Sequence, residues 1–222
     1  MATDGDRLAA VLFDMDGTLV DSEKVWSVGL AELARHHGGV LSDGARRAMV
    51  GSNMTDSMRI LHDDLGLPAT RAETDASVVW LERRVKELFR DGVEWRPGAQ
   101  QLLAALRSAA VPLALVTATH RHLVDVALVT IGADNFDAVV AGDEVESTKP
   151  HPMPYLTAAR LLGAEPARCV AIEDSPNGVT SARAAGCAVL AVPCEVDLDP
   201  EGVTLVESLL DVDVDYLRKL IP

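Results

Sequence analysis

Residues 11–23 read VLFDMDGTLVDSE, an apolar run that ends on two aspartates placed two positions apart. Short continuous apolar runs are typical of strands buried on both faces of a parallel sheet. Such runs occur at residues 8–13, 111–116, 138–141, 169–172 and 188–192, and helical patterns at 99–110, 120–131, 154–162 and 177–185 alternate with them. The alternation predicts an α/β fold with a Rossmann-like parallel sheet covered by helices on both faces.

One part of the chain interrupts this alternation. Between residues 22 and 93 only helical patterns occur, at 25–36, 43–49, 55–65 and 72–89. We therefore expect a helical cap domain, residues 22–93, inserted after the first strand of a core domain formed by residues 1–21 and 94–222. The turn signal WRPG at residues 95–98 marks the return to the core, and residues 195–222 are expected to form a last strand or turn and a short helix.

The composition excludes several classes of protein. The chain has 222 residues, 48% of them hydrophobic and 24% charged, and a net charge of −14. This charge argues against nucleic acid or an anionic membrane as a partner, and we find no signal-peptide pattern and no long apolar span. The three cysteines lack Cys-x-x-Cys spacing and are expected to be buried thiols of a cytoplasmic protein.

Polar residues follow the predicted strands at their carboxyl ends. In open parallel sheets these ends share one edge, where ligands bind. That edge is expected to gather four carboxylates, one lysine and several hydroxyl groups: Asp14, Asp16, Thr18, Thr117, Thr119, Lys149, Glu173, Asp174 and Ser175. Because clustered carboxylates cannot all stay ionised unaided, the pattern predicts a hard divalent cation, and Mg²⁺ suits carboxylates, water and phosphate.

The first two aspartates suggest phosphoryl chemistry. Asp14 is available as a nucleophile toward phosphorus, and Asp16 is close enough to act as general acid and then as base. Gly17 permits the sharp turn that points both side chains inward. The Thr117 hydroxyl, backbone N–H groups and Lys149 are expected to hold the phosphoryl oxygens.

Four motifs in order resemble the haloacid dehalogenase-like superfamily, in its phosphatase and β-phosphoglucomutase branch with a helical cap. They are DMDGTLVDS at residues 14–22, Thr117, Lys149 with Pro150, and EDSPNG at residues 173–178. The resemblance implies Asp14 as the phosphorylated nucleophile, Asp16 as acid and base, and Mg²⁺ held by Asp14, the backbone carbonyl of Asp16, and Asp174. It also implies that Thr117, Ala118 and Lys149 bind the phosphoryl group, with Glu173, Thr18 and Asn177 beside these groups.

Within this branch we favour a phosphatase over a mutase. Asp16 favours phosphate ester chemistry, because members that cleave other bonds generally lack this carboxylate. Mutase-like members tend to carry a phosphate-binding arginine in the cap, whereas residues 51–58 read GSNMTDSM, with Met54 at that place. Arg59, one or two turns further on, could substitute for it, so a β-phosphoglucomutase-like isomerase remains an alternative, and a non-catalytic phospho-ligand binder is a third.

The remaining expectations concern the surroundings of the site. The expected partner is a small phosphorylated metabolite, by analogy a sugar phosphate, and the chain is expected to be a monomer or weak homodimer. Cap closure is expected to hinge near residues 19–22 and 94–97. We interpret Ser22 as a helix N-cap, His120 as a cap or neighbouring residue, and Trp26 and Trp80 as packing residues or part of a substrate surface. The other histidines lack ligand spacing and are expected at the surface or its boundary: His36, His37, His62, His122 and His151.

Overall fold

The computed structural model describes residues 8–49, 52–194, 198 and 201–222. Its centre is a six-stranded sheet in which every neighbouring pair is parallel, in the order β3-β2-β1-β4-β5-β6. The strands are β1 (Ala10–Phe13), β2 (Leu113–Val116), β3 (Ala138–Val140), β4 (Cys169–Glu173), β5 (Ala188–Ala191) and β6 (Thr204–Leu205). The predicted α/β fold with a parallel sheet is confirmed.

Strand β1 lies between β2 and β4, with Val11 opposite both Leu113 and Val170. Its side chains alternate between two apolar clusters: Val11 and Phe13 join one, and Ala10 and Leu12 join the other. All four residues are fully buried. Because both faces of the strand are covered, the sequence is a continuous apolar run and not an alternating one.

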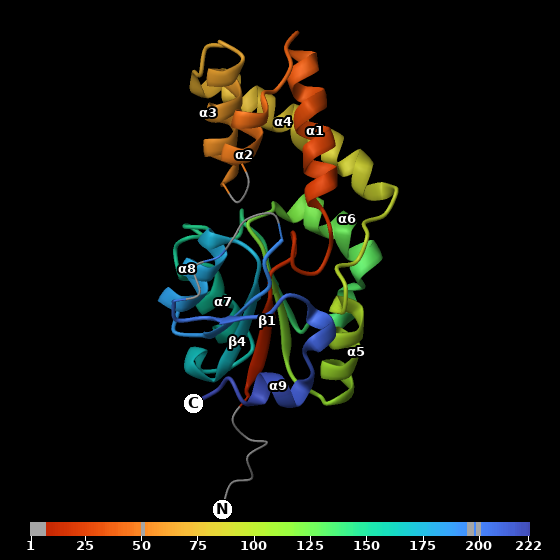
Figure 1. Cartoon of the computed structure of the whole chain (residues 1–222), viewed down its shortest axis with the longest axis vertical. Helices are drawn as coiled ribbons and strands as arrows, with labels where there is room; N and C mark the ends of the chain where they lie inside the picture. The colour runs from red at the N-terminus through yellow and green to blue at the C-terminus, as the bar shows by residue number, and fades with distance from the viewer. Residues whose placement is uncertain (1–7, 50–51, 195–197, 199–200) are drawn as a thin grey trace, which may run out of the picture.

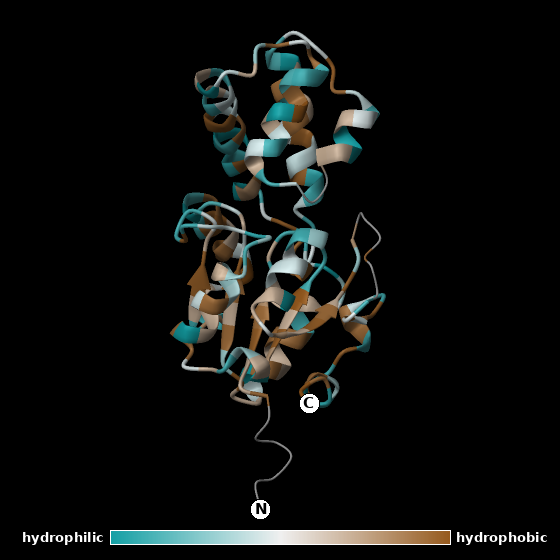
Figure 2. Cartoon of the chain, turned by 90° about the vertical axis from the view of Figure 1, so that its left-hand side faces the viewer, coloured by the Kyte–Doolittle hydropathy of each residue, from teal (hydrophilic) through white to brown (hydrophobic). Residues whose placement is uncertain are grey.

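Helices cover both faces of the sheet (Figures 1 and 2). Apolar residues of α5, α6 and α9 belong to the cluster of Val11, whereas those of α7 and α8 belong to the cluster of Leu12. The bounds are α5 (Ala99–Ser108), α6 (Arg121–Ile131), α7 (Met153–Leu161), α8 (Pro176–Ala184) and α9 (Val214–Arg218), with short 3₁₀ turns η2 (Ala133–Asn135), η3 (Pro166–Arg168) and η4 (Leu209–Asp211).

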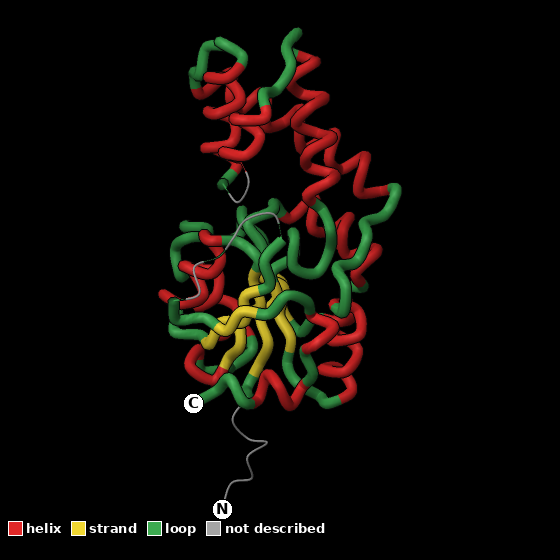
Figure 3. The backbone as a smooth tube through the Cα atoms, in the orientation of Figure 1, coloured by secondary structure: helices red, strands yellow, loops and turns green. Residues whose placement is uncertain are grey.

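Four further helices lie together beyond the carboxyl ends of the strands (Figure 1): α1 (Glu23–His36), α2 (Asp43–Met49), α3 (Met54–Asp64) and α4 (Arg71–Arg90). We call them the α1–α4 segment. The two connections to this segment pair with each other. Val20 forms an antiparallel bridge with Trp95, the Asp21 N–H donates to the Glu94 carbonyl at 2.8 Å, and the Arg96 N–H donates to the Leu19 carbonyl at 2.9 Å. The loops that follow the strands meet between the sheet and the α1–α4 segment (Figure 3).

The rest of the fold follows the sequence expectations in most places. The last strand and short helix of the tail are present as β6 and α9, although residues 195–197 and 199–200, like residues 1–7 of the expected core, lie outside the described residues. None of the described helices combines the length and apolar character needed to cross a membrane. Cys169 and Cys187 are buried as expected, whereas Cys194 is only half-buried.

Candidate active site

Asp14 begins the loop that leaves β1. Its N–H donates to the Ile172 carbonyl of β4 at 3.0 Å, so the backbone stays tied to the sheet for one residue beyond the strand. Gly17 then turns the chain with a φ of 79°, a conformation that L side chains rarely adopt. A Cβ on Gly17 would lie 2.0 Å from Asp174 Oδ2. The glycine therefore allows both the turn and the close approach of Asp174.

Lys149 joins two carboxylates from different strands. Its Nζ donates to Asp14 Oδ1 and to Glu173 Oε1, each at 2.6 Å, and to the Val116 carbonyl at 2.9 Å. The lysine side chain is 4% exposed, and those of Asp14 and Glu173 are 8% and 0% exposed. A buried ammonium with three acceptors is fully satisfied, so it fixes both carboxylates relative to the sheet edge.

Glu173 has two further donors. The Tyr155 hydroxyl donates to Glu173 Oε1 at 2.5 Å, and the Ser175 hydroxyl donates to Oε2 at 3.2 Å. A Cβ on Gly178 would lie 1.9 Å from this carboxylate, so the start of α8 packs directly on it. Glu173 is thus held from three sides and is positioned as a neighbour of the other carboxylates, as the sequence predicts.

Asp174 lies beside Asp14, at the edge predicted to hold the cation. The Thr18 hydroxyl donates to Asp174 Oδ1 at 3.4 Å, and both residues are buried. Carboxylate oxygens of Asp14, Glu173 and Asp174 all lie within 4.8 Å of one another. These residues, 160 positions apart at the extremes, therefore converge on one point.

The carboxylate cluster has too little positive charge around it to keep all of its buried carboxyl groups ionised. Burial raises the pKa of the Asp14 carboxyl to about 8, with Glu173 and Asp16 adding to the rise and Lys149 opposing it. Burial also raises the pKa of Asp174 well above its ordinary value, and the charges of Asp14 and Glu173 act in the same direction. Burial lowers the pKa of Lys149, but Asp14 and Glu173 outweigh this effect and raise it overall. One ammonium does not balance three buried carboxylates.

The donor set of the cluster fits a hard divalent cation. All ligand atoms offered by Asp14, Glu173 and Asp174 are carboxylate oxygens, and a bound cation would stabilise the charged forms that burial disfavours. Mg²⁺ and Ca²⁺ prefer such oxygen donors, and Mg²⁺ takes one or two carboxylates together with substrate phosphate. The residues present are therefore suited to a magnesium ion.

Asp16 is held apart from this cluster by four donors. Ser22 Oγ and Trp26 Nε1 donate to its Oδ1 at 2.6 and 3.2 Å, and Thr117 Oγ1 and Thr119 Oγ1 donate to Oδ2 at 3.1 and 2.7 Å. Ser22 is the N-cap residue of α1, as expected, but its hydroxyl makes no capping hydrogen bond and donates to Asp16 instead. Trp26 both packs edge-on against Phe89 and orients Asp16.

The loop after β2 brings the predicted phosphate-binding residues to the same place. Thr117 and Ala118 line the cavity above Asp14, and the Thr119 N–H donates to Thr117 Oγ1 at 3.0 Å. Asn177 also lines the cavity, one residue into α8, whose N-cap is Ser175. Every site residue predicted from the sequence therefore lies at this edge of the sheet or contacts a residue that does.

A cavity of about 530 Å³ lies between the sheet edge and the α1–α4 segment. The segment contributes Trp26, Arg46 and a polar group of Asn53, Asp56 and Ser57 to its lining. Met54 lines it too, but Arg59 does not: its guanidinium is exposed and pairs with Asp56 at 3.3 Å. Gly51 of the same stretch lies outside the described residues.

Several contacts were missed by sequence reasoning. Thr119 was expected at this edge, but its hydrogen bond to Asp16 was not. Tyr155 had no signal in the sequence, since it reaches Glu173 from a separate helix. The expectation that His62 lies near the surface is wrong: it is buried and bonds to Ser77 Oγ at 2.9 Å. Trp80 stacks on His36 with ring centroids 5.1 Å apart and does not line the cavity.

The sequence profile of the haloacid dehalogenase-like hydrolases matches residues 8–186 of the chain. The chain belongs to this family. It is 35% identical over 195 residues to hexitol phosphatase A of Escherichia coli K12, and the match covers 86% of each chain. The predicted membership of the phosphatase branch of the haloacid dehalogenase-like hydrolases, and with it the enzyme class, is confirmed.

Solved structures of haloacid dehalogenase-like proteins share the architecture. The structure of a CbbY mutant from Rhodobacter sphaeroides, in complex with xylulose-(1,5)bisphosphate, superposes with a TM-score of 0.85 at 25% identity, covering 95% of this chain and 99% of that one. A protein described as a putative β-phosphoglucomutase from Thermotoga maritima gives a TM-score of 0.71 at 27% identity, covering 89% of this chain and 93% of that one. Both phosphatase and mutase names therefore occur among the similar proteins.

Proposed function

We propose that the chain is a Mg²⁺-dependent phosphatase that hydrolyses a small phosphorylated metabolite through a phosphate ester of Asp14. The observation that carries this proposal is the convergence of Asp14, Lys149, Glu173 and Asp174 at the edge of the sheet, with Asp16 held separately beside them. A buried nucleophile, an oriented acid and a cation site within one cavity are what phosphoryl transfer requires.

In the first step a carboxylate oxygen of Asp14 attacks phosphorus and the ester bond to the leaving oxygen breaks. Asp16 gives its proton to that oxygen, so the product leaves as a neutral alcohol. In the second step Asp16 takes a proton from a water molecule, whose oxygen attacks phosphorus, and the bond between phosphorus and Asp14 breaks. Inorganic phosphate is released, and both aspartates return to their starting states.

The remaining residues bind and orient. Mg²⁺ would be held by Asp14, the backbone carbonyl of Asp16, and Asp174, where it supplies positive charge to the phosphoryl oxygens. Lys149, the Thr117 hydroxyl and the backbone at Ala118 bind the transferred phosphoryl group. Glu173 and Thr18 position Lys149 and Asp174 through their hydrogen bonds, and Asn177 lies at the rim of the cavity.

The substrate is proposed to be a sugar or polyol phosphate. The cavity of about 530 Å³ admits a small metabolite, and the α1–α4 segment presents hydroxyl, amide and carboxylate groups to the side away from Asp14. Such groups suit the hydroxyls of a polyol. The name of the hexitol phosphatase to which the chain is similar points the same way.

We also propose that residues 22–93 act as a cap domain. The paired connections at residues 19–21 and 94–96 form a narrow link at which the segment could rotate. Closure would exclude bulk water while the phosphoryl group is transferred, and opening would release the products. A cytoplasmic location and a monomeric or weakly dimeric state remain predictions.

A β-phosphoglucomutase-like activity is the second candidate. The likeness to the Thermotoga maritima protein supports it, and so does Arg46, whose position in the cavity lining could serve a second phosphate. A mutase would interconvert glucose 1-phosphate and glucose 6-phosphate when given catalytic amounts of a hexose bisphosphate, without net release of phosphate.

The test is a screen of hexitol phosphates, ketose 1-phosphates and p-nitrophenyl phosphate with Mg²⁺, and again after chelation. We expect phosphate release that needs Mg²⁺ and that falls by at least about a thousandfold in Asp14→Asn. Asp63→Asn, an exposed aspartate of α3, is the matched control and should retain activity. Binding of Mg²⁺ and phosphate without turnover of any substrate would favour a non-catalytic binder.

A further inference from the structure

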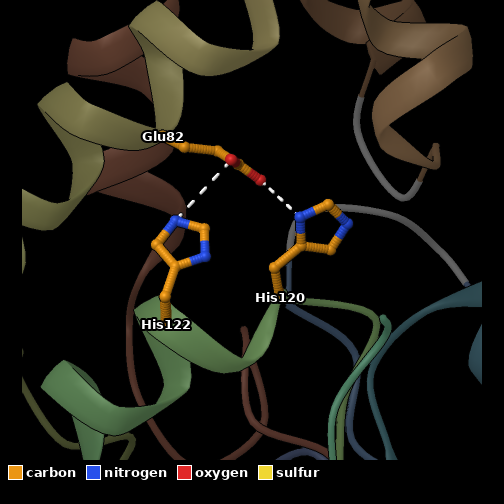
Figure 4. A group of neighbouring side chains, drawn as sticks. All are labelled: Glu82, His120 and His122. Atoms are coloured by element: carbon orange, nitrogen blue, oxygen red, sulfur yellow. Dashed lines mark ion pairs between the residues drawn. The ribbon is translucent and has the colours of Figure 1, made fainter. Parts of the chain in front are cut away.

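A second group of ionisable side chains lies where the α1–α4 segment meets α6, away from the carboxylate cluster. Glu82 projects from α4 toward His120 and His122 at the start of α6 (Figure 4). Glu82 Oε1 lies 2.6 Å from His120 Nδ1, and Glu82 Oε2 lies 3.6 Å from His122 Nε2. We call these three residues the Glu82–His cluster.

Among the described residues, the Glu82 carboxylate forms no ion pair with a lysine or an arginine. Glu82 is only 9% exposed, and its ion pairs among the described residues are with the two histidines. Glu82 Oε1 is also buried without a hydrogen-bond partner in the described part of the chain, although His120 Nδ1 lies 2.6 Å away. A buried carboxylate oxygen of this kind is costly unless a charge or a donor compensates it.

Two imidazole nitrogens and one carboxylate oxygen are a donor set that transition metals prefer. The three ligand atoms lie within 4.8 Å of one another. Around a tetrahedral ion with ligand distances near 2 Å they would lie about 3.3 Å apart, which small side-chain rotations would achieve. Zn²⁺ is commonly bound by two histidines and a glutamate with an open fourth position, whereas Mg²⁺ disfavours nitrogen ligands.

Access to the cluster is open from solvent. The His120 and His122 side chains are 39% and 43% exposed, although Glu82 beneath them is buried. His120 occupies the N-cap position of α6 without making a capping hydrogen bond, so its imidazole is available as a ligand. The expectation that His120 is a cap residue holds for its position, although its side chain does not cap the helix.

We propose that Glu82, His120 and His122 bind a transition-metal ion such as Zn²⁺, which joins α4 to α6. Because Glu82 belongs to the α1–α4 segment and the histidines to the sheet domain, the ion would link the two parts beside the cavity. Glu82 and His120 also line that cavity. A bound ion would therefore hinder opening of the segment and inhibit turnover; the inhibition rests on the proposed function, but the binding does not.

Direct binding of Zn²⁺ tests the site. Zn²⁺ affinity is measured by competition with a chromophoric chelator in excess Mg²⁺, which occupies the carboxylate cluster. We expect one Zn²⁺ per chain, and an affinity at least about tenfold lower in both Glu82→Gln and His122→Asn. His36→Asn is the matched control, since His36 belongs to a separate group of histidines on the α1–α4 segment. Thermal unfolding verifies that each variant is folded.

Co²⁺ gives a second readout that does not depend on activity. Its visible absorption in the wild-type protein should show a tetrahedral site with nitrogen ligands, and His122→Asn should lose it. Wild-type Zn²⁺ affinity in both Glu82→Gln and His122→Asn, or an equal loss in His36→Asn, would overturn the proposal. If Glu82→Gln does not fold, His122→Asn alone decides. Binding without inhibition at saturating Mg²⁺ would overturn only the link between the site and opening.

Discussion

The carboxylate cluster at the sheet edge and the Glu82–His cluster differ in donors, burial and support. The first is built from oxygen ligands at the ends of two strands, β1 and β4, and is fixed by a buried lysine, a tyrosine and two further hydroxyls. The second offers mainly nitrogen ligands, is partly exposed and spans two parts of the molecule. On the two proposals made above, the oxygen site would bind Mg²⁺ and the more open nitrogen site would bind Zn²⁺, so that one chain would separate a hard cation from a softer one.

Among the variants that test this difference between the two clusters, Gly17→Ala is expected to have the largest effect, a loss of Mg²⁺ affinity at the carboxylate cluster. The new Cβ would lie 2.0 Å from Asp174 Oδ2 and would displace a proposed Mg²⁺ ligand. We expect Mg²⁺ affinity, measured from the Mg²⁺ dependence of phosphate release, to fall by about 10–100-fold. Gly38→Ala is the control, because Gly38 has a φ of 81° but open space around it. If Gly17→Ala lost no more Mg²⁺ affinity than Gly38→Ala, the role given to the close approach of Gly17 and Asp174 would be contradicted.

Removal of the Tyr155 hydroxyl tests how firmly the carboxylate cluster is held. Burial raises the pKa of Tyr155 well above its ordinary value, and Glu173 acts in the same direction, so the hydroxyl stays a donor. Tyr155→Phe takes one of three donors from the fully buried Glu173, and we expect the free energy of unfolding in urea to fall by about 1–2 kcal/mol. Tyr216→Phe, at a half-buried tyrosine of α9, should change it by less than about 0.5 kcal/mol. An unchanged midpoint in Tyr155→Phe would contradict the role given to this bond.

Thr119→Val tests the role of Asp16 as general acid separately from the role of Asp14 as nucleophile. It removes the 2.7 Å hydrogen bond to Asp16 but leaves three other donors, so we expect kcat on an alkyl phosphate to fall roughly fivefold. p-Nitrophenyl phosphate has a leaving group that departs without a proton, and its kcat should change less. Thr180→Val, on the exposed side of α8, is the control. Equal losses on both substrates would show that Thr119 does not act through Asp16.

The smallest effect on Mg²⁺ affinity at the carboxylate cluster is expected from His122→Asn. If the two clusters are independent, this variant should keep the wild-type Mg²⁺ affinity while it loses Zn²⁺. Asp174→Asn should show the reverse: weak Mg²⁺ binding and retained Zn²⁺ binding. Isothermal titration with each metal measures both. If either variant weakened the binding of both metals, the two clusters would be coupled and could not be treated as separate sites.

The sequence predicts the parallel sheet and the carboxylate cluster because both depend on local patterns. Buried runs such as the one at β1 end on polar residues, and the topology of parallel strands brings those ends to one edge. Asp14 and Asp174 could therefore be placed together from a sequence that separates them by 160 positions. The turn at Gly17 follows equally from local chemistry.

Contacts that depend on tertiary placement could not be predicted in this way. Tyr155 lies on α7 and reaches Glu173 at the end of β4, and no helical or strand periodicity in the sequence links these two residues. Ser22 has the sequence of a helix cap, but its hydroxyl is taken by a carboxylate that a turn brings within 2.6 Å. Glu82 meets His120 and His122 only because α4 packs against α6. Such contacts form only when helices pack against one another, and the pattern of apolar residues in the sequence does not determine how two helices pack.

Acid quenching during turnover shows whether Asp14 accepts the phosphoryl group. Wild-type protein is mixed with Mg²⁺ and a substrate that it hydrolyses, quenched within one turnover, digested with pepsin and examined by mass spectrometry. We expect a phosphorylated peptide whose modified residue is Asp14, which forms and decays at rates matching phosphate release and is absent without Mg²⁺. Phosphate release at the full rate with no modification at Asp14, or with the phosphoryl group on another residue, would contradict this role of Asp14.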